Sequence, residues 1–188
     1  MFSYLVRRLI PNSEDTSSPA VREKYGTLCS LLGIFLNVLL FGGKLFAGLL
    51  SGSIAITADA FNNLSDAGSS IITLAGFRLA GKKPDPDHPF GHGRMEYIAG
   101  FVVSLAILLM GVELAKSSID KLLHPEAPEF SLLVAGILAA SIAVKLYMAS
   151  YNRYAADKVS SPAMRATSLD SLSDSVATTV VLLSMLVY

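Results

Sequence analysis

The chain has 188 residues, of which 52% are hydrophobic and 16% are charged. An ordinary soluble domain carries roughly 25% charged residues, so this apolar excess points to a membrane protein. The 15 Lys and Arg balance the 15 Asp and Glu, which argues against a nucleic-acid partner, and one cysteine, Cys29, excludes an internal disulfide and a multi-cysteine metal cluster.

Five apolar segments are long enough to cross a bilayer, which takes about 20 helical residues. In chain order they are residues 26–50, 54–80, 97–115, 130–151 and 164–188. The second and fifth depart most from an apolar span, because each contains two carboxylates. The sequence predicts an all-α, polytopic transmembrane helix bundle. A large soluble helical protein is the alternative, and the short connections argue against it.

Basic residues predict how the segments are oriented. Lys and Arg are concentrated before the first segment, between the second and third, and between the fourth and fifth. The positive-inside rule therefore predicts a cytoplasmic N-terminus and two cytoplasmic loops. Residues 1–25 do not form a convincing signal peptide, because Arg7 and Arg8 interrupt the apolar start. This cytoplasmic leader is either a short surface helix or, as is more common, mobile.

Oxygen-bearing side chains recur at helical spacing inside the second and fifth segments. Asn62 and Asp66 are four residues apart, as are Asp170 and Asp174, so each pair lies on one face of its helix. The pairs lie about 14–21 Å into two helices that run in opposite directions, at a rise of 1.5 Å per residue. We therefore expect both pairs near the middle of a hydrocarbon core about 30 Å thick.

Charged groups at this depth are costly and usually functional. Three carboxylates repel one another, and a divalent cation would relieve that repulsion. Oxygen-only ligation suits a hard ion such as Mn²⁺. The alternative is that these side chains form hydrogen bonds between helices or line a water-filled crevice. Asp59 is a candidate for supporting a ligand or guarding the entrance, whereas Lys44 and Lys145 are expected to form salt bridges or to snorkel.

These motifs, taken together and in this order, resemble those of the cation diffusion facilitator family, from about residue 25 to residue 188. Residues 59–66 resemble the family's second-span metal motif, and residues 170–174 resemble its fifth-span motif. The loop of residues 85–96, which contains His-Pro-Phe-Gly-His-Gly-Arg, resembles the characteristic loop after the second span.

The resemblance implies a transporter that moves divalent transition metals out of the cytosol, commonly in exchange for protons. It implies a transport site of Asn62, Asp66, Asp170 and Asp174. Zinc-transporting members carry His in both pairs, where this chain has Asn62 and Asp170. The chain thus resembles the manganese-transporting branch, with Zn²⁺, Fe²⁺ or Co²⁺ as alternatives. No cofactor is expected besides the transported ion. The expected partners are the lipid of a prokaryotic cell membrane and a second copy of the chain.

The loop after the second segment suggests a second metal site. Asp85, His88 and His92 resemble residues that form an accessory site in some zinc-transporting relatives. The alternative is that this loop caps the third helix and contacts lipid headgroups. His124 follows the third segment, on the opposite side of the membrane, and is expected to be a loop residue.

The chain departs from the family pattern at its end. The family has six spans followed by a cytoplasmic domain that contributes to dimerisation, whereas this sequence stops at Tyr188 with the fifth span. This leaves a fragment, a split transporter or a truncated gene product as interpretations. The functional alternative is a non-transporting membrane subunit that needs a partner. An enzyme is not expected, because no nucleophile–base arrangement, phosphate-binding glycine loop or oxyanion motif is evident.

Overall fold

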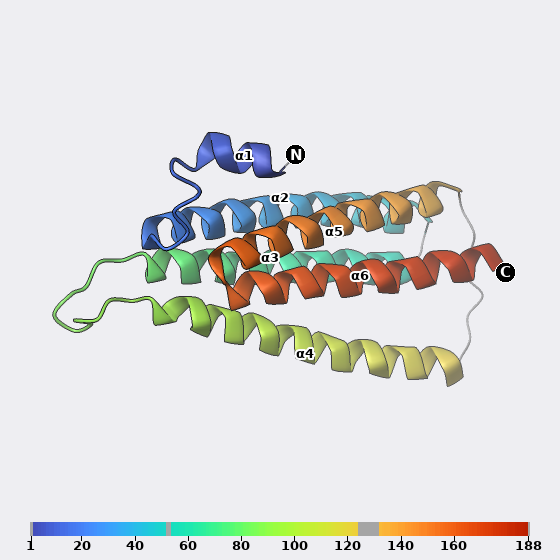
Figure 1. Ribbon diagram of the computed structural model, residues 1–188. Coiled ribbons are helices and arrows are strands. Elements are labelled where there is room, and N and C mark those ends of the chain that lie inside the picture. Colours follow the sequence, from blue (N-terminus) through green and yellow to red (C-terminus); the bar gives the residue numbers. More distant parts are fainter. Residues whose placement is uncertain (1, 52–53, 124–131, 188) are drawn as a thin grey trace.

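The computed structural model describes residues 2–51, 54–123 and 132–187, and in these ranges it contains α-helices and no strand. The helices are α1 (Phe2–Leu9), α2 (Pro19–Ser51), α3 (Ile54–Ala80), α4 (Arg94–Leu123), α5 (Leu132–Val159) and α6 (Pro162–Val187). The five long helices alternate in direction, so α2, α4 and α6 all begin at one end of the bundle (Figure 1). We call this the basic end. The predicted all-α bundle is confirmed, and His124 lies outside the described residues.

The long helices correspond to the five predicted segments. Helix α3 begins and ends as predicted, whereas α2, α4, α5 and α6 continue past the apolar stretch at one or both ends. The end of a helix is set by how its backbone is capped, so a helix can continue past its apolar stretch. For example, α2 begins at Pro19, where the carbonyl of Ser18 accepts hydrogen bonds from the N–H groups of Val21 and Arg22. Within the described ranges, α2, α4 and α5 each contain a stretch long and apolar enough to cross a membrane.

Small residues allow close contacts between neighbouring helices. Helix α2 packs against α3 and α5, α5 packs against α6, and α4 contacts both α3 and α6. A Cβ atom added to Gly76 of α3 would lie 2.3 Å from Cβ of Ala99 in α4, and one added to Gly100 of α4 would lie 3.1 Å from the backbone N of Ala163 in α6. Such contacts are typical of helix association in lipid, where burial of apolar surface gives no advantage.

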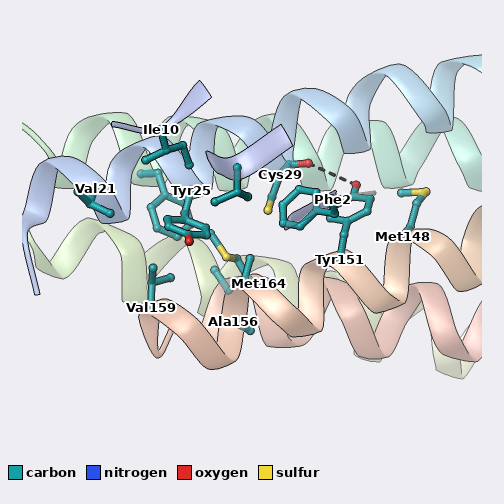
Figure 2. Packing of buried hydrophobic residues seen from close by; sticks show 14 residues of the cluster. Phe2, Ile10, Val21, Tyr25, Cys29, Met148, Tyr151, Ala156, Val159 and Met164 are labelled. Atoms are coloured by element: carbon teal, nitrogen blue, oxygen red, sulfur yellow. Dashed lines mark hydrogen bonds between the residues drawn. The ribbon is translucent and has the colours of Figure 1, made fainter. Parts of the chain in front are cut away.

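The short helix α1 is part of the packed structure. Phe2, Val6 and Ile10 are spaced by one helical turn and are buried on one face, against a cluster that includes Tyr25 and Tyr151 (Figure 2). The rings of Phe2 and Tyr151 stack with centroids 5.2 Å apart. Of the two expectations for the leader, the structure shows the short helix.

Candidate metal centre

Helices α3 and α6 bring three carboxylates together inside the bundle. One oxygen from each of Asp66, Asp170 and Asp174 lies within 4.8 Å of the other two. Asp66 and Asp170 are buried, and the side chain of Asp174 is 12% exposed. Each of these residues lies about 12–18 Å from the start of its own helix at 1.5 Å per residue. The antiparallel helices thus place their carboxylates at one level, as their spacing predicted.

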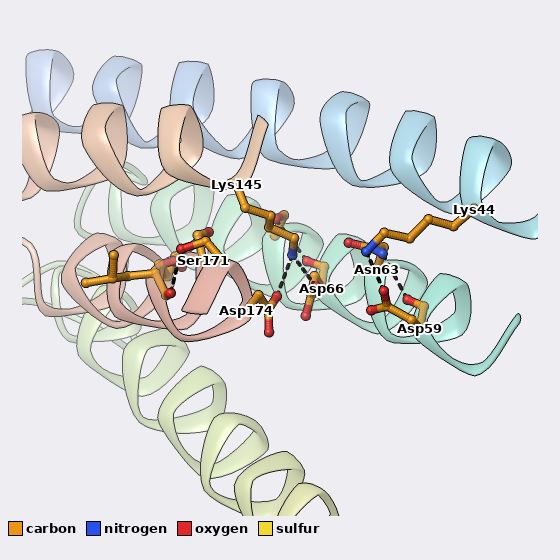
Figure 3. Close-up of polar contacts among 11 residues, drawn as sticks. Lys44, Asp59, Asn63, Asp66, Lys145, Ser171 and Asp174 are labelled. Atoms are coloured by element: carbon orange, nitrogen blue, oxygen red, sulfur yellow. Dashed lines mark hydrogen bonds and ion pairs between the residues drawn. The ribbon is translucent and has the colours of Figure 1, made fainter. Parts of the chain in front are cut away.

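Lys145 of α5 extends into this carboxylate cluster. Its Nζ lies 2.6 Å from Oδ2 of Asp66 and 2.6 Å from Oδ2 of Asp174 (Figure 3). The lysine side chain is only 2% exposed. Hydrogen bonds between ionised groups are short and strong, so the ammonium offsets part of the negative charge of the cluster. Of the two roles expected for Lys145, the structure shows the salt bridge.

The cluster keeps an acceptor atom that the protein does not satisfy. Oδ1 of Asp66 is buried and has no hydrogen-bond partner within the described ranges. Buried polar atoms in native proteins nearly always have a partner, because leaving one unsatisfied is costly. An oxygen of this kind, beside two further carboxylates, is suited to binding a cation.

The other candidate residues of α3 have separate surroundings. Asn62 is half-buried one turn before Asp66, and its role as a ligand stays a prediction. The Asp59 carboxylate lies 2.8 Å from Nζ of the buried Lys44 of α2, so its supporting role also stays a prediction. The buried Asn63 donates a hydrogen bond from Nδ2 to the carbonyl of Asp59, 2.9 Å away (Figure 3).

The sequence reasoning did not assign Lys145 to the carboxylate cluster. Lys145 is 79 residues away from Asp66 and 29 residues away from Asp174 in the chain. Its depth is a signal for its level only: it lies about 20 Å into α5, which runs in the same direction as α3, at 1.5 Å per residue. Depth alone predicts the level of a side chain and not the direction in which it points.

The loop between α3 and α4 gathers a second group of possible ligands. One atom each of Asp85, His88 and His92 lies within 4.8 Å of the other two. Nδ1 of His88 is 3.1 Å from Oδ1 of Asp85, and Nε2 of His92 is 3.4 Å from Oδ2. The backbone N–H of His88 also donates to Oδ1 of Asp85 at 2.7 Å, a turn that aspartate side chains favour. Gly91, with a φ of 79°, lets the chain turn back toward α4.

The electrostatics of this loop keep its carboxylate ionised. Desolvation acts to raise the pKa of Asp85, but the hydrogen bonds from the backbone and ring of His88 and the charges of both imidazoles outweigh it and lower the pKa. The side chain of His92 is 9% exposed, and its Nδ1 has no partner within the described ranges. One carboxylate and two imidazoles form a donor set that divalent metals accept.

Comparison with known proteins gives one family throughout. The cation efflux transmembrane domain matches residues 30–188. The manganese efflux system protein MneS of Bacillus subtilis is 33% identical over 151 residues, which are 80% of this chain and 52% of that protein. MneP of the same organism is 32% identical over 157 residues, 83% of this chain and 52% of MneP.

A protein of a second organism is also similar. The uncharacterized transporter MJ0449 of Methanocaldococcus jannaschii is 32% identical over 156 residues, which are 83% of this chain and 55% of that protein. The chain therefore spans about half the length of these relatives.

Proposed function

The chain belongs to the cation efflux family, the cation diffusion facilitators, and from this premise we propose that it takes part in the efflux of divalent metal ions, with Mn²⁺ as its cargo. The observation that carries the proposal is the convergence of Asp66, Asp170 and Asp174 inside a helical bundle, in which α2, α4 and α5 are long and apolar enough to cross a membrane. Carboxylates are costly at membrane depth, and apolar side chains would pack there at lower cost. Three carboxylates at one level, one of them with an unsatisfied oxygen, therefore support a functional role.

The choice of Mn²⁺ rests on ligand chemistry and on two relatives. The proposed ligands are the three carboxylates and the amide oxygen of Asn62, which offer oxygen donors only. Hard ions accept such a set, whereas imidazole or thiolate favours Zn²⁺. MneS and MneP are named as manganese efflux proteins, which supports the same cargo. Zinc or iron efflux through the same site is the alternative.

The proposed mechanism is alternating access. The ion enters from the cytoplasm, binds at mid-depth, and is released on the far side after the helices rock around it. We place the N-terminus and the basic end in the cytoplasm because Lys and Arg gather there. Protons that return through the site can neutralise its carboxylates and release the metal, which gives proton antiport.

Two further features belong to the same proposal. The loop group of Asp85, His88 and His92 is proposed as an accessory metal site at the cytoplasmic surface. A homodimer is proposed for the complete family architecture, of which this chain spans about half. The alternative function is a non-transporting membrane subunit that needs a partner.

Metal uptake into vesicles tests the proposed function. The chain is reconstituted, and initial uptake of Mn²⁺, Zn²⁺, Fe²⁺ and Co²⁺ is measured with and without a pH gradient. Mn²⁺ uptake is expected to be the fastest, and Asp66→Ala and Asp170→Ala are each expected to abolish it. Asp157→Ala, which removes an exposed carboxylate of α5, is the matched control and should transport normally.

The other outcomes of this experiment are informative. Uptake that survives Asp66→Ala and Asp170→Ala would contradict the site. Uptake that ignores the pH gradient would remove the proton exchange. Absence of flux together with retained metal binding would favour the subunit hypothesis.

A further inference from the structure

One group at the centre of the bundle is not explained by metal transport: a lysine whose charge has the same sign as the cargo. We propose that Lys145 is a tethered counter-cation, which occupies the carboxylate cluster when no metal is bound and which the incoming ion displaces. This inference rests on the proposed function, because it assumes that the three carboxylates bind the metal.

The geometry places the ammonium where a metal would bind. Nζ of Lys145 lies 2.6 Å from an oxygen of Asp66 and 2.6 Å from an oxygen of Asp174. A hard divalent ion sits about 2.0–2.6 Å from its oxygen ligands. An ion bridging the same two oxygens would therefore occupy nearly the same position as the ammonium. The two cations cannot share it.

The same geometry leaves an entry point for the metal. The described ion pairs of Lys145 are with Asp66 and Asp174 and do not include Asp170, whose side chain is part of the cluster. Oδ1 of Asp66 is also without a partner in the described ranges. An ion can thus bind first to Asp170 and to this free oxygen. It then takes over Asp174 as the ammonium withdraws on its flexible four-carbon stem.

A tethered cation has consequences for transport that a free ion would not have. Because Lys145 belongs to the chain, its effective concentration at the carboxylates is high, and it competes with the metal at every step. It weakens metal binding, which favours release on the far side. It also compensates part of the carboxylate charge in the empty site, so the empty bundle can return without three unpaired carboxylates at its centre.

Metal affinity measured by titration calorimetry tests the inference. Mn²⁺ alone is titrated into the purified, metal-free chain in detergent. Lys145→Gln and Lys145→Met remove the competing charge, and each is expected to tighten the Kd for Mn²⁺ by about tenfold or more. Lys145→Arg is expected to weaken binding instead, because the planar guanidinium holds carboxylates at two points and is harder to displace.

A second buried lysine provides the matched control. Lys44 is equally buried and pairs with Asp59, outside the three-carboxylate cluster. Lys44→Gln makes the same chemical change and should leave the Kd near the wild-type value. An equal gain in Lys44→Gln would show that any lost internal charge strengthens binding, and would overturn the proposal. So would an unchanged or weaker Kd in Lys145→Gln and Lys145→Met, or a tighter one in Lys145→Arg.

Two aspartate variants separate this inference from the proposed function. Asp66→Asn and Asp170→Asn should each greatly weaken Mn²⁺ binding. If they bind as the wild type does, the carboxylate site itself is wrong. If they lose binding while the Lys145 variants match the wild type, the site stands and the tethered counter-cation is wrong. If Lys145→Gln and Lys145→Met do not fold, the direction of change in Lys145→Arg still decides.

Discussion

At Asn62 a single side chain sets the balance between oxygen and nitrogen in the proposed transport site. The amide offers a neutral oxygen one turn before Asp66, whereas a histidine there would offer a ring nitrogen. Imidazole favours Zn²⁺ over hard ions, so ligand chemistry at this position should influence which metal is carried.

We predict that Asn62→His raises the rate of Zn²⁺ uptake relative to Mn²⁺ uptake by about tenfold, a change of roughly 1.4 kcal/mol in relative transition-state stabilisation. The measurement is the ratio of initial uptake rates in vesicles at equal free metal concentration. Asn62→Gln keeps an amide oxygen and serves as the control, with a ratio near that of the wild type. An Asn62→His protein with an unchanged ratio would mean that this side chain does not contact the ion.

At the scale of elements, the junction of α5 and α6 shows how two long helices end and begin within a few residues. Ser160 has a φ of 50°, and the N–H of Ser161 donates to the carbonyl of Ala156 at 3.1 Å, which closes the last turn of α5. The carbonyl of Ser161 then accepts from the N–H of Arg165 at 3.1 Å, and Pro162 opens α6. A serine occupies a position that usually takes glycine.

We predict that Ser160→Gly stabilises the protein by about 1 kcal/mol, because glycine adopts a positive φ without the steric cost of a Cβ atom. Unfolding in detergent, followed by circular dichroism, measures the change. The control is Ser150→Gly at an exposed position within α5, where glycine should instead destabilise the helix by roughly 0.5 kcal/mol. Destabilisation by Ser160→Gly would show that the serine side chain has a role that outweighs the backbone strain.

The helices and the level of the carboxylates follow from the sequence, but two features do not. Apolar length predicted the span of α3 at both ends, and underestimated α2, whose first turns are polar and are fixed by the Ser18–Pro19 start. Depth along each helix predicted that Asp66 and Asp170 would meet. It could not predict the contact with Lys145, because the direction in which α5 turns that side chain depends on packing against α2 and α6.

The whole molecule exposes large apolar side chains and buries several charged ones, unlike a typical soluble protein. Large apolar side chains are exposed along the bundle, with Leu49 71% and Phe101 69% exposed, while Asn37, Lys44 and Lys145 are buried within it. In water this arrangement would be unstable, because apolar surface would face the solvent and the buried charged groups would lose their hydration. In lipid the exposed apolar surface has a matching environment, and the buried charges can pair with one another across helices.

Arg22 joins three helices at the basic end through a partly buried ion pair and a hydrogen bond. Nη2 of Arg22 in α2 lies 3.0 Å and 3.1 Å from the two carboxylate oxygens of Glu96 in α4, and its Nη1 donates to the carbonyl of Val159 at the end of α5. The side chain of Glu96 is 5% exposed and that of Arg22 is 26% exposed. This contact holds the proposed cytoplasmic ends of α2, α4 and α5 together, so its strength bears on whether that end can open.

We predict that Arg22→Gln lowers the free energy of unfolding by about 1–3 kcal/mol, because it leaves a buried carboxylate without its cation. Glu96→Gln should have a similar effect for the converse reason. The double variant should lose less free energy of unfolding than the two single variants lose together, since neither unpaired charge then remains. Unfolding of the wild type, the two single variants and the double variant in the same detergent measures the coupling between Arg22 and Glu96. The control is Arg153→Gln, at an exposed position of α5, which should change stability by no more than about 0.5 kcal/mol. Strictly additive losses would show that Arg22 and Glu96 stabilise the bundle independently, and that the ion pair does not hold its basic end closed.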